Sequence, residues 1–117
     1  MRRDKRHLGE FELYVMLAVA RLGDDAYGGA LRREIEERTS RSVAIGALYA
    51  TLDRLGDKNL LRFRVEEPGA GRPGRARRYC HLTPAGEEAL QLSADMLRRM
   101  MDGVEVRGVP LVDGSAG

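Results

Sequence analysis

The fold is decided by AIGALYATLDRLGDKNLL, residues 44–61, and by RFRVEEPGAGRPGRARRYCHL, residues 62–82, which follows it directly. The first stretch predicts an amphipathic helix, because apolar residues recur at intervals of three and four: Ile45, Leu48, Tyr49, Leu52 and Leu55. The second predicts a hairpin. Leu61, Phe63 and Val65 alternate with polar residues, a glycine- and proline-rich loop spans residues 68–74, and residues 77–82 return as the partner strand.

The hairpin is followed by TPAG, residues 83–86, which has the composition of a helix start. Thr83 can cap the helix, and Pro84 suits its first turn. Along this last helix, a spacing of four, three, four and three is typical of a coiled-coil seam: Leu90, Ala94, Leu97, Met101 and Val104. We expect Gly103 to end the helix and to leave Val104 outside it.

Two more helices are expected before residue 44. Residues 11–22 are apolar around almost the whole circumference, so that in a small protein part of this helix should meet a second subunit. A second helix from about Tyr27 to Arg38 has Leu31 and Ile35 on its inner face. Residues 39–42 form a polar turn, and we expect Ser42 to cap the third helix.

Length and composition favour one globular domain. The chain has 117 residues and one cysteine, so it has no intrachain disulfide. No apolar run is long enough to cross a bilayer, and the basic start continues into Gly9 and Glu10 instead of a signal-peptide core. We therefore expect a cytoplasmic protein with no membrane partner.

Charge is distributed unevenly, although the net charge is only +2. Cations outnumber acids between residues 41 and 82, whereas the flanking segments carry more acids than bases. Helix, basic hairpin and helix in this order predict a winged helix-turn-helix, a mainly α fold with a small β-hairpin wing in the order α-α-α-β-β-α. The expected parts are a basic arm at 1–7, the DNA-binding domain at 8–83, a dimerisation helix at 84–104 and a loosely ordered tail at 105–117.

In this interpretation the third helix enters the major groove of double-stranded DNA while the wing contacts phosphates. Small residues near the helix start would let its backbone approach the bases, and Thr51 and Arg54 would donate hydrogen bonds. The expected DNA-contacting residues are Ser42, Ala44, Gly46, Ala47, Tyr49, Ala50, Thr51, Arg54, Arg72, Arg75 and Arg77.

Two of these expectations, and the role of the basic arm, have alternatives. Tyr49 lies on the apolar stripe, so it either packs in the core with its hydroxyl at the edge or contacts a phosphate. Arg54 either contacts DNA or pairs with acids on its own helix. The arm residues Arg2, Arg3, Lys5 and Arg6 either touch the DNA backbone or form a solvated end.

Three segments in this order resemble the PadR-like winged-helix transcriptional regulators. They are AYGGALRREIEERT, residues 26–39, IGALYATLDRLGDKNLL, residues 45–61, and GRPGRARRYCHLTPAGEEAL, residues 71–90. The short last helix is similar to the compact branch of that family. The resemblance implies a homodimer joined through its first and last helices that binds a palindromic operator and usually represses, with release by a small hydrophobic effector. Cys80 departs from the family, which commonly has an aromatic residue there.

The apolar faces of the terminal helices predict the dimer interface, with Phe11, Tyr14, Val15, Leu90, Ala94, Leu97 and Met101. Met96 and Met100 either pack in this interface or line an adaptable effector pocket. Leu97 is central to the proposed seam.

The sequence gives little support for redox sensing, metal binding or catalysis. Cys80 alternates with its neighbours along a strand, which indicates a buried structural thiol instead of a redox sensor. His7 and His81 are too few and too separated for a convincing metal site, and no cofactor is expected. No nucleophile sits near a base, so an enzyme is not indicated. The main alternative function is a winged helix that binds an acidic protein partner and has no sequence-specific contact with DNA.

Overall fold

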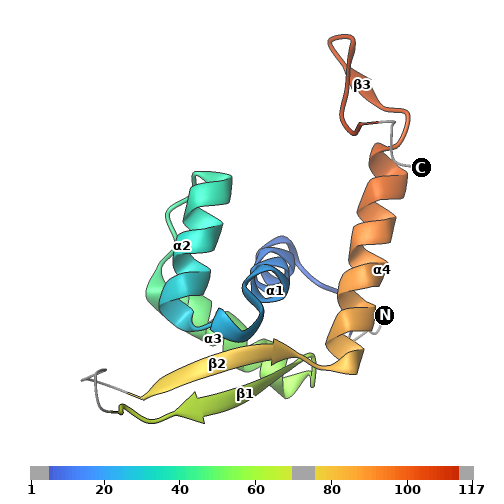
Figure 1. The fold of residues 1–117 in the computed structure, drawn as a ribbon. Coiled ribbons are helices and arrows are strands. Elements are labelled where there is room, and N and C mark those ends of the chain that lie inside the picture. Colours follow the sequence, from blue (N-terminus) through green and yellow to red (C-terminus); the bar gives the residue numbers. More distant parts are fainter. Residues whose placement is uncertain (1–5, 70–75, 114–117) are drawn as a thin grey trace.

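The computed structural model describes residues 6–69 and 76–113 (Figure 1). Its larger elements are the helices α1 (Glu10–Leu22), α2 (Gly28–Thr39), α3 (Ile45–Asp57) and α4 (Pro84–Met101), and the strands β1 (Leu61–Glu66) and β2 (Arg77–Leu82). A short 3-10 helix (Gly23–Asp25) follows α1. The mainly helical fold with one hairpin wing, predicted from the sequence, is confirmed.

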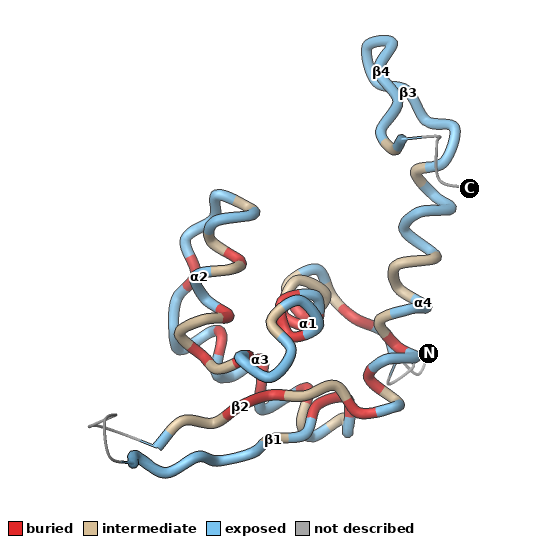
Figure 2. The backbone as a smooth tube through the Cα atoms, viewed as in Figure 1, coloured by how far each residue is buried: buried red, intermediate tan, exposed pale blue. Residues whose placement is uncertain are grey.

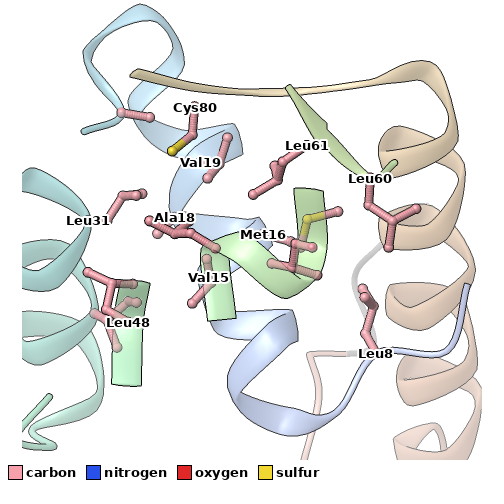
Figure 3. Close-up of a cluster of buried hydrophobic side chains, with 14 of the residues drawn as sticks. Leu8, Val15, Met16, Ala18, Val19, Leu31, Leu48, Leu60, Leu61 and Cys80 are labelled. Carbon is pink, nitrogen blue, oxygen red and sulfur yellow. The ribbon is translucent and has the colours of Figure 1, made fainter. Parts of the chain in front are cut away.

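The core surrounds α1, which lies between α2 and α4 (Figure 1). Val15, Met16 and Val19 of α1 are at most 2% exposed. Figure 3 shows Val15 on the side of Leu31 and Leu48, and Met16 on the side of Leu60 and Leu61. Burial is concentrated around α1, at the base of the hairpin and at the start of α4, while the outer half of α4 is mostly exposed (Figure 2). One core therefore holds the three N-terminal helices and the base of the wing together.

The register of the wing decides which arginines share a face. β1 and β2 are antiparallel, with Leu61 opposite Leu82 and Glu66 opposite Arg77. Side chains directly opposite one another project to the same side. The inner face carries Leu61, Phe63, Val65, Arg78, Cys80 and Leu82, and the outer face carries Arg62, Arg64, Glu66, Arg77, Tyr79 and His81. The sequence predicted that one face of β1 is buried. This is true only at the base of the hairpin, because Val65, near the other end of β1, is 59% exposed.

The start of α3 differs from the expectation that Ser42 caps it. The N-cap is Ala44, whose side chain offers no hydrogen bond, and Ser42 is exposed two residues earlier. Val43 explains the shift, because it is buried in the core and its N–H donates to Glu36 Oε2 at 2.8 Å. Burial of Val43 and its bond to α2 take the place of a side-chain cap.

The start of α4 is fixed by Thr83 and Gly86. The Thr83 hydroxyl donates to the Asn59 carbonyl at 2.7 Å and accepts the Gly86 N–H at 2.9 Å, so the predicted cap is confirmed. The Thr83 N–H also donates to the Leu60 carbonyl at 3.2 Å. A Cβ on Gly86 would lie 2.0 Å from that carbonyl oxygen, closer than atoms can approach. Only glycine lets the first turn of α4 reach the α3–β1 connection.

The C-terminal segment contains a small hairpin where no element was expected. β3 (Glu105–Val106) pairs with β4 (Val109–Pro110), and the Leu111 N–H donates to the Val104 carbonyl at 3.0 Å. The turn between them places Arg107 at φ 55° and Gly108 at φ 79°. Gly103 follows the end of α4, as predicted, and the hairpin stands beyond that helix (Figure 1).

Glu12 is a buried charge that joins α1 to α3. Its Oε1 accepts the Gly9 N–H at 2.9 Å, and its Oε2 accepts from Arg54 Nε at 3.1 Å and Lys58 Nζ at 3.0 Å. Burial by itself raises the pKa of Glu12, but the hydrogen bonds from Gly9, Lys58 and Arg54 outweigh it and lower the pKa below its ordinary 4.5. Glu12 therefore stays ionised and fixes the C-terminal half of α3.

We expect Gly86→Ala to destabilise the protein by about 3 kcal/mol, at the upper end for overpacking, because the Leu60 carbonyl belongs to the backbone and cannot move aside. Gly46→Ala is the matched control, since a Cβ there meets nothing within 4 Å. It should stabilise α3 by about 0.5–1 kcal/mol. Urea unfolding of both variants checks this, and equal stability of the two would contradict the packing argument.

We expect Glu12→Gln to lower the free energy of unfolding by about 1–2 kcal/mol at pH 7, since charge-assisted bonds from Arg54 and Lys58 are lost. Because the folded pKa lies below the unfolded one, the contribution of the carboxylate is present above pH 4.5 and disappears as the pH falls through the folded pKa. The difference between wild type and variant should therefore shrink in acid.

The measurement is urea unfolding at several pH values between 3 and 7. Glu88→Gln is the control, because its pair with Arg6 is exposed and should contribute little. A wild-type advantage that is the same at pH 3 and pH 7 would show that the Glu12 charge is not responsible.

Candidate nucleic-acid interface

The outward face of α3 is lined by small side chains. Gly46, Ala47 and Ala50 are exposed, as the sequence predicted, and Ser42 and Ala44 are exposed just before the helix. Without long side chains, the backbone of this helix can come close to another surface. The exposed positions therefore form a shallow, smooth face at the first two turns of α3.

Thr51 was expected on this face, and that expectation is wrong. The residue is 3% exposed, and its hydroxyl donates to the Ala47 carbonyl at 2.8 Å. This internal bond satisfies the hydroxyl, so Thr51 can occupy a core position on α3 beside Leu52 and Leu55. It is not available to a ligand in this structure.

Ile45 was expected in the core but is 42% exposed. Tyr49, for which core packing and a phosphate contact were both left open, is also 42% exposed. The Tyr49 ring lies over the start of α2, where a Cβ on Gly28 would be 2.4 Å from its hydroxyl oxygen. Glycine at position 28 thus provides the space for the tyrosine. The side chain is held at the edge of the exposed α3 face, with part of its surface open to solvent.

Arg78 connects the wing to α3 and was not among the residues expected to contact DNA. Its guanidinium lies 4.4 Å from the Phe63 ring centroid and 5.9 Å from that of Tyr49, and its Nη1 donates to Asp53 Oδ1 at 3.1 Å. The strand register contained the signal, because Arg78 shares its face with Cys80, which was expected to point inward. Arg78 also offsets the charge of Asp53 on the outward side of α3.

The other wing arginines are distributed differently. Arg77 lies on the outer face of the hairpin, with its guanidinium 4.2 Å from the Tyr27 ring centroid. Contacts with Tyr79 first, and then with Tyr27, raise the pKa of Arg77. Arg72 and Arg75 lie outside the described residues. The structure thus brings Arg78 to α3 and places Arg77 on the opposite side of the sheet.

Arg54 pairs with an acid, but not on its own helix. Its Nε donates to Glu12 of α1 at 3.1 Å and its Nη2 to the Thr51 hydroxyl at 3.3 Å. Of the basic arm, Arg6 pairs with Glu88 of α4 at 2.9 Å, while Arg2, Arg3 and Lys5 lie outside the described residues. Arg54 therefore joins α3 to α1, and Arg6 joins the segment before α1 to α4.

The residues expected at a dimer interface fall into two groups. Val15 is fully buried within the chain, so its assignment to a subunit interface is wrong. Phe11, Tyr14, Leu90, Ala94 and Met101 are half-buried. Leu97 is 48% exposed and lies with Leu92, Met96 and Met100 on an α4 that exposes much apolar surface. Such contiguous apolar surface is typical of an interaction site.

A cleft of about 230 Å³ lies between α1 and α2 and was not anticipated. Its apolar wall is formed by Tyr14, Leu17, Ala18 and Ile35, and its rim carries Arg21, Glu34, Arg38 and Thr39. Met96 and Met100, for which a dimer interface and an effector pocket were both left open, do not line this cleft. They are exposed on α4 instead.

Cys80 is fully buried, as expected, and burial raises the pKa of its thiol to about 11, with a smaller opposing effect of Arg78. The thiol is therefore protonated at neutral pH and has low reactivity. Over residues 6–69 and 76–113, no group of three His, Cys, Asp or Glu side chains could hold a metal ion. Within the same residues, every helix is too short or too polar to traverse a lipid bilayer.

Comparison with known proteins places this geometry in a family. Residues 16–92 match the transcriptional regulator PadR-like family. A PadR-like transcription factor from Bacteroides fragilis is 26% identical, with a TM-score of 0.64 over 77% of this chain and 82% of the other. The PadR family regulator from Eggerthella lenta is also 26% identical, with a TM-score of 0.60 over 80% and 82% of the two chains.

Two further relatives are informative. Halobacterium salinarum RosR shares the fold at 24% identity, with a TM-score of 0.67 over 87% of this chain and 84% of the other. An uncharacterised 37.1 kDa protein of transposon Tn4556 from Streptomyces fradiae is 36% identical over 96 residues. That match covers 81% of this chain but 26% of the relative, so the chain spans about a quarter of its length.

PadR-like proteins are transcription regulators and not enzymes. The family match over most of the fold, together with the helices and wing described above, shows that the chain belongs to the PadR-like family of transcriptional regulators.

Proposed function

We propose that the chain is a homodimeric, sequence-specific DNA-binding regulator of transcription that acts in the cytoplasm, most simply as a repressor released by a small hydrophobic effector. The observation that carries the proposal is the exposed small-residue face of α3, bordered by Tyr49 and Arg78. PadR-like regulators bind DNA, and this face has the form that a major-groove helix requires.

The two parts of this face would have different roles. The methyl groups of Ala47 and Ala50 can contact thymine methyls, and Gly46 lets the helix backbone approach the groove. At the edge, the Tyr49 hydroxyl and Arg78 would donate to phosphates. Arg78 has five N–H donors and can bind a phosphate while it remains paired with Asp53. Ser42 and Ala44 lie at the helix start, where backbone N–H groups favour anions.

Dimerisation would bring together two copies of the exposed α3 face. Leu90, Ala94, Leu97 and Met101 of α4, with Phe11 and Tyr14 of α1, would pack against the same residues of a second copy. Two copies of α3 about 34 Å apart would enter successive major grooves on one side of a palindromic operator. The exposed apolar surface of α4 supports this arrangement, since a partner would cover it.

The cleft between α1 and α2 gives the effector a candidate site. Its wall is apolar and its rim polar, which suits a small hydrophobic molecule. Tyr14 lines the cleft and also belongs to the proposed dimer surface, so occupancy of the cleft could change the subunit arrangement. An effector would release the operator only to the extent that it binds the non-binding geometry more tightly. Met96 and Met100 would then belong to the dimer surface.

Selection of bound fragments from a random duplex library tests the proposal directly. We expect an enriched palindrome with half-site centres about one helical turn apart. Binding to random duplex should weaken steeply with salt, with a log–log slope of about 0.9 for each neutralised phosphate. If the chain enriched no sequence and its binding to duplex did not depend on salt, the proposal would be wrong. The alternative function, a winged helix that binds an acidic protein partner, would then be favoured.

We expect Arg78→Ala to lower affinity about five- to tenfold for specific and random duplex alike, and to reduce the salt slope by about 0.9, because one phosphate contact is lost. Arg98→Ala is the control, since Arg98 is exposed on α4 and pairs with Asp95 there. Salt-titrated anisotropy measures both. Unchanged binding by Arg78→Ala would remove this residue from the interface.

We expect Leu97→Glu to give monomers, because it would place a charge in the apolar contact between two copies of α4. Gln91→Glu is the control, as it adds the same charge at an exposed polar position of α4. Light scattering after gel filtration reports the mass. A Leu97→Glu protein that stayed dimeric would show that α4 does not form the contact.

A further inference from the structure

The C-terminal hairpin has one apolar face, which the proposed function does not use. Val106 lies opposite Val109 in the register, and the Leu111 N–H donates to the Val104 carbonyl at 3.0 Å, so that both pairs project to the same side. We name Val104, Val106, Val109 and Leu111 the hairpin apolar face. Each of these side chains is between 39% and 63% exposed.

The hairpin holds this face in a fixed shape. Its two-residue turn, Arg107 and Gly108, has positive φ at both positions, which suits the twist of antiparallel strands. The strand pair Glu105 and Pro110 projects to the side opposite the hairpin apolar face. A hairpin of two strands is only marginally stable in water unless its apolar side packs against another element. We therefore expect another surface to cover this face.

The described part of the same chain leaves the hairpin apolar face open. Residues 102–111 are all exposed. The hairpin stands beyond the end of α4, away from α1 and α2 (Figure 1 and Figure 2). Because α4 has 18 residues, it carries the hairpin about 27 Å from the turn where the helix begins. A cover for this face has to come from another molecule.

The proposed dimer brings a second copy to this place. Leu97 and Met100 on the outer half of α4 are exposed and lead directly to Val104, so one apolar surface continues from α4 into the hairpin. Within a chain, α1 lies between α4 and α2 (Figure 1). Where the outer half of α4 packs on α1 of the second copy, the hairpin extends past that helix to the α1–α2 cleft. Tyr14 belongs both to this cleft and to the proposed dimer surface.

The cleft matches the hairpin in polarity and in charge. Its wall is apolar and includes Leu17, which is 41% exposed. Its rim carries Arg21 and the ion pair of Arg38 with Glu34, a net charge of +1. Residues 102–111 carry two acids and one arginine, a net charge of −1. An apolar centre surrounded by opposite charges is the usual form of a specific protein contact.

We propose that the hairpin apolar face of each copy packs over the α1–α2 cleft of the other copy and closes it. This inference rests on the proposed function, because it requires the dimer. The hairpin and an effector would use the same apolar wall, so an effector has to displace the hairpin to bind. Loss of that contact between subunits then couples the cleft to the geometry of the dimer.

Cysteine pairs test the contact. Oxidation of Leu17→Cys combined with Val109→Cys should give a covalent dimer, because the hairpin tip would lie within disulfide reach of the cleft wall of the second copy. Glu37→Cys combined with Val109→Cys is the matched control, since Glu37 is exposed on α2 and does not line the cleft. The control should stay uncrosslinked. Cys80 is buried and should not take part.

The reactivity of a thiol in the cleft tests closure. The Leu17→Cys thiol should react with a soluble maleimide about tenfold faster once Val109→Asp is added, because the new carboxylate cannot stay in an apolar contact and the hairpin leaves the cleft. Val65→Asp is the matched control, since Val65 is a similarly exposed valine on the wing. It should leave the rate unchanged.

The outcomes separate this inference from the proposed function, with light scattering giving the mass before oxidation. If the chain is dimeric but Leu17→Cys with Val109→Cys does not crosslink, or crosslinks no better than the Glu37→Cys control, the hairpin does not cover the cleft and the dimer stands. An unchanged maleimide rate with Val109→Asp would have the same meaning. A disulfide within one chain would place the hairpin on its own cleft and overturn the inference. If the wild-type chain is monomeric, the dimer and this inference fail together.

Discussion

The buried carboxylate of Glu12 is the constraint on which the arrangement of the helices depends. It closes the start of α1 through the Gly9 N–H and holds α3 through Arg54 and Lys58. A buried charge with these partners is costly to break, because any loss of one partner leaves the carboxylate poorly compensated. With α3 fixed in this way, its small-residue face points outward. Arg54 is paired with Glu12 and supports the fold instead of facing a ligand.

Much of the architecture could be predicted because local patterns and tertiary packing agree. The alternation of residues 61–66 gave β1, and Thr83 and Pro84 gave the start of α4. The inward position of Cys80 followed from its place in the strand. In each case the signal lies within a few residues, and the structure satisfies it directly.

The rest depended on contacts between distant residues. Thr51 is buried, against expectation, because its hydroxyl bonds to the Ala47 carbonyl in its own helix, and Tyr49 stays partly exposed because Gly28 leaves room for its ring beside α2. Arg77 and Arg78 are adjacent in sequence, but the strand register sends them to opposite sides of the sheet. The turn of the C-terminal hairpin uses Arg107 at positive φ, a position where Asn or Gly is the usual signal.

Gly86 packs closely against the Leu60 carbonyl, so α4 is held at its first turn and can act as a lever about that point. The helix has 18 residues and so extends about 27 Å from a fulcrum in its first turn. A tilt of about 10° at that fulcrum would move the far end by about 5 Å, close to one helical turn. Because the fulcrum adjoins the connection from α3 to the wing, strain applied at the free end of α4 would reach the part of the molecule that we propose contacts DNA.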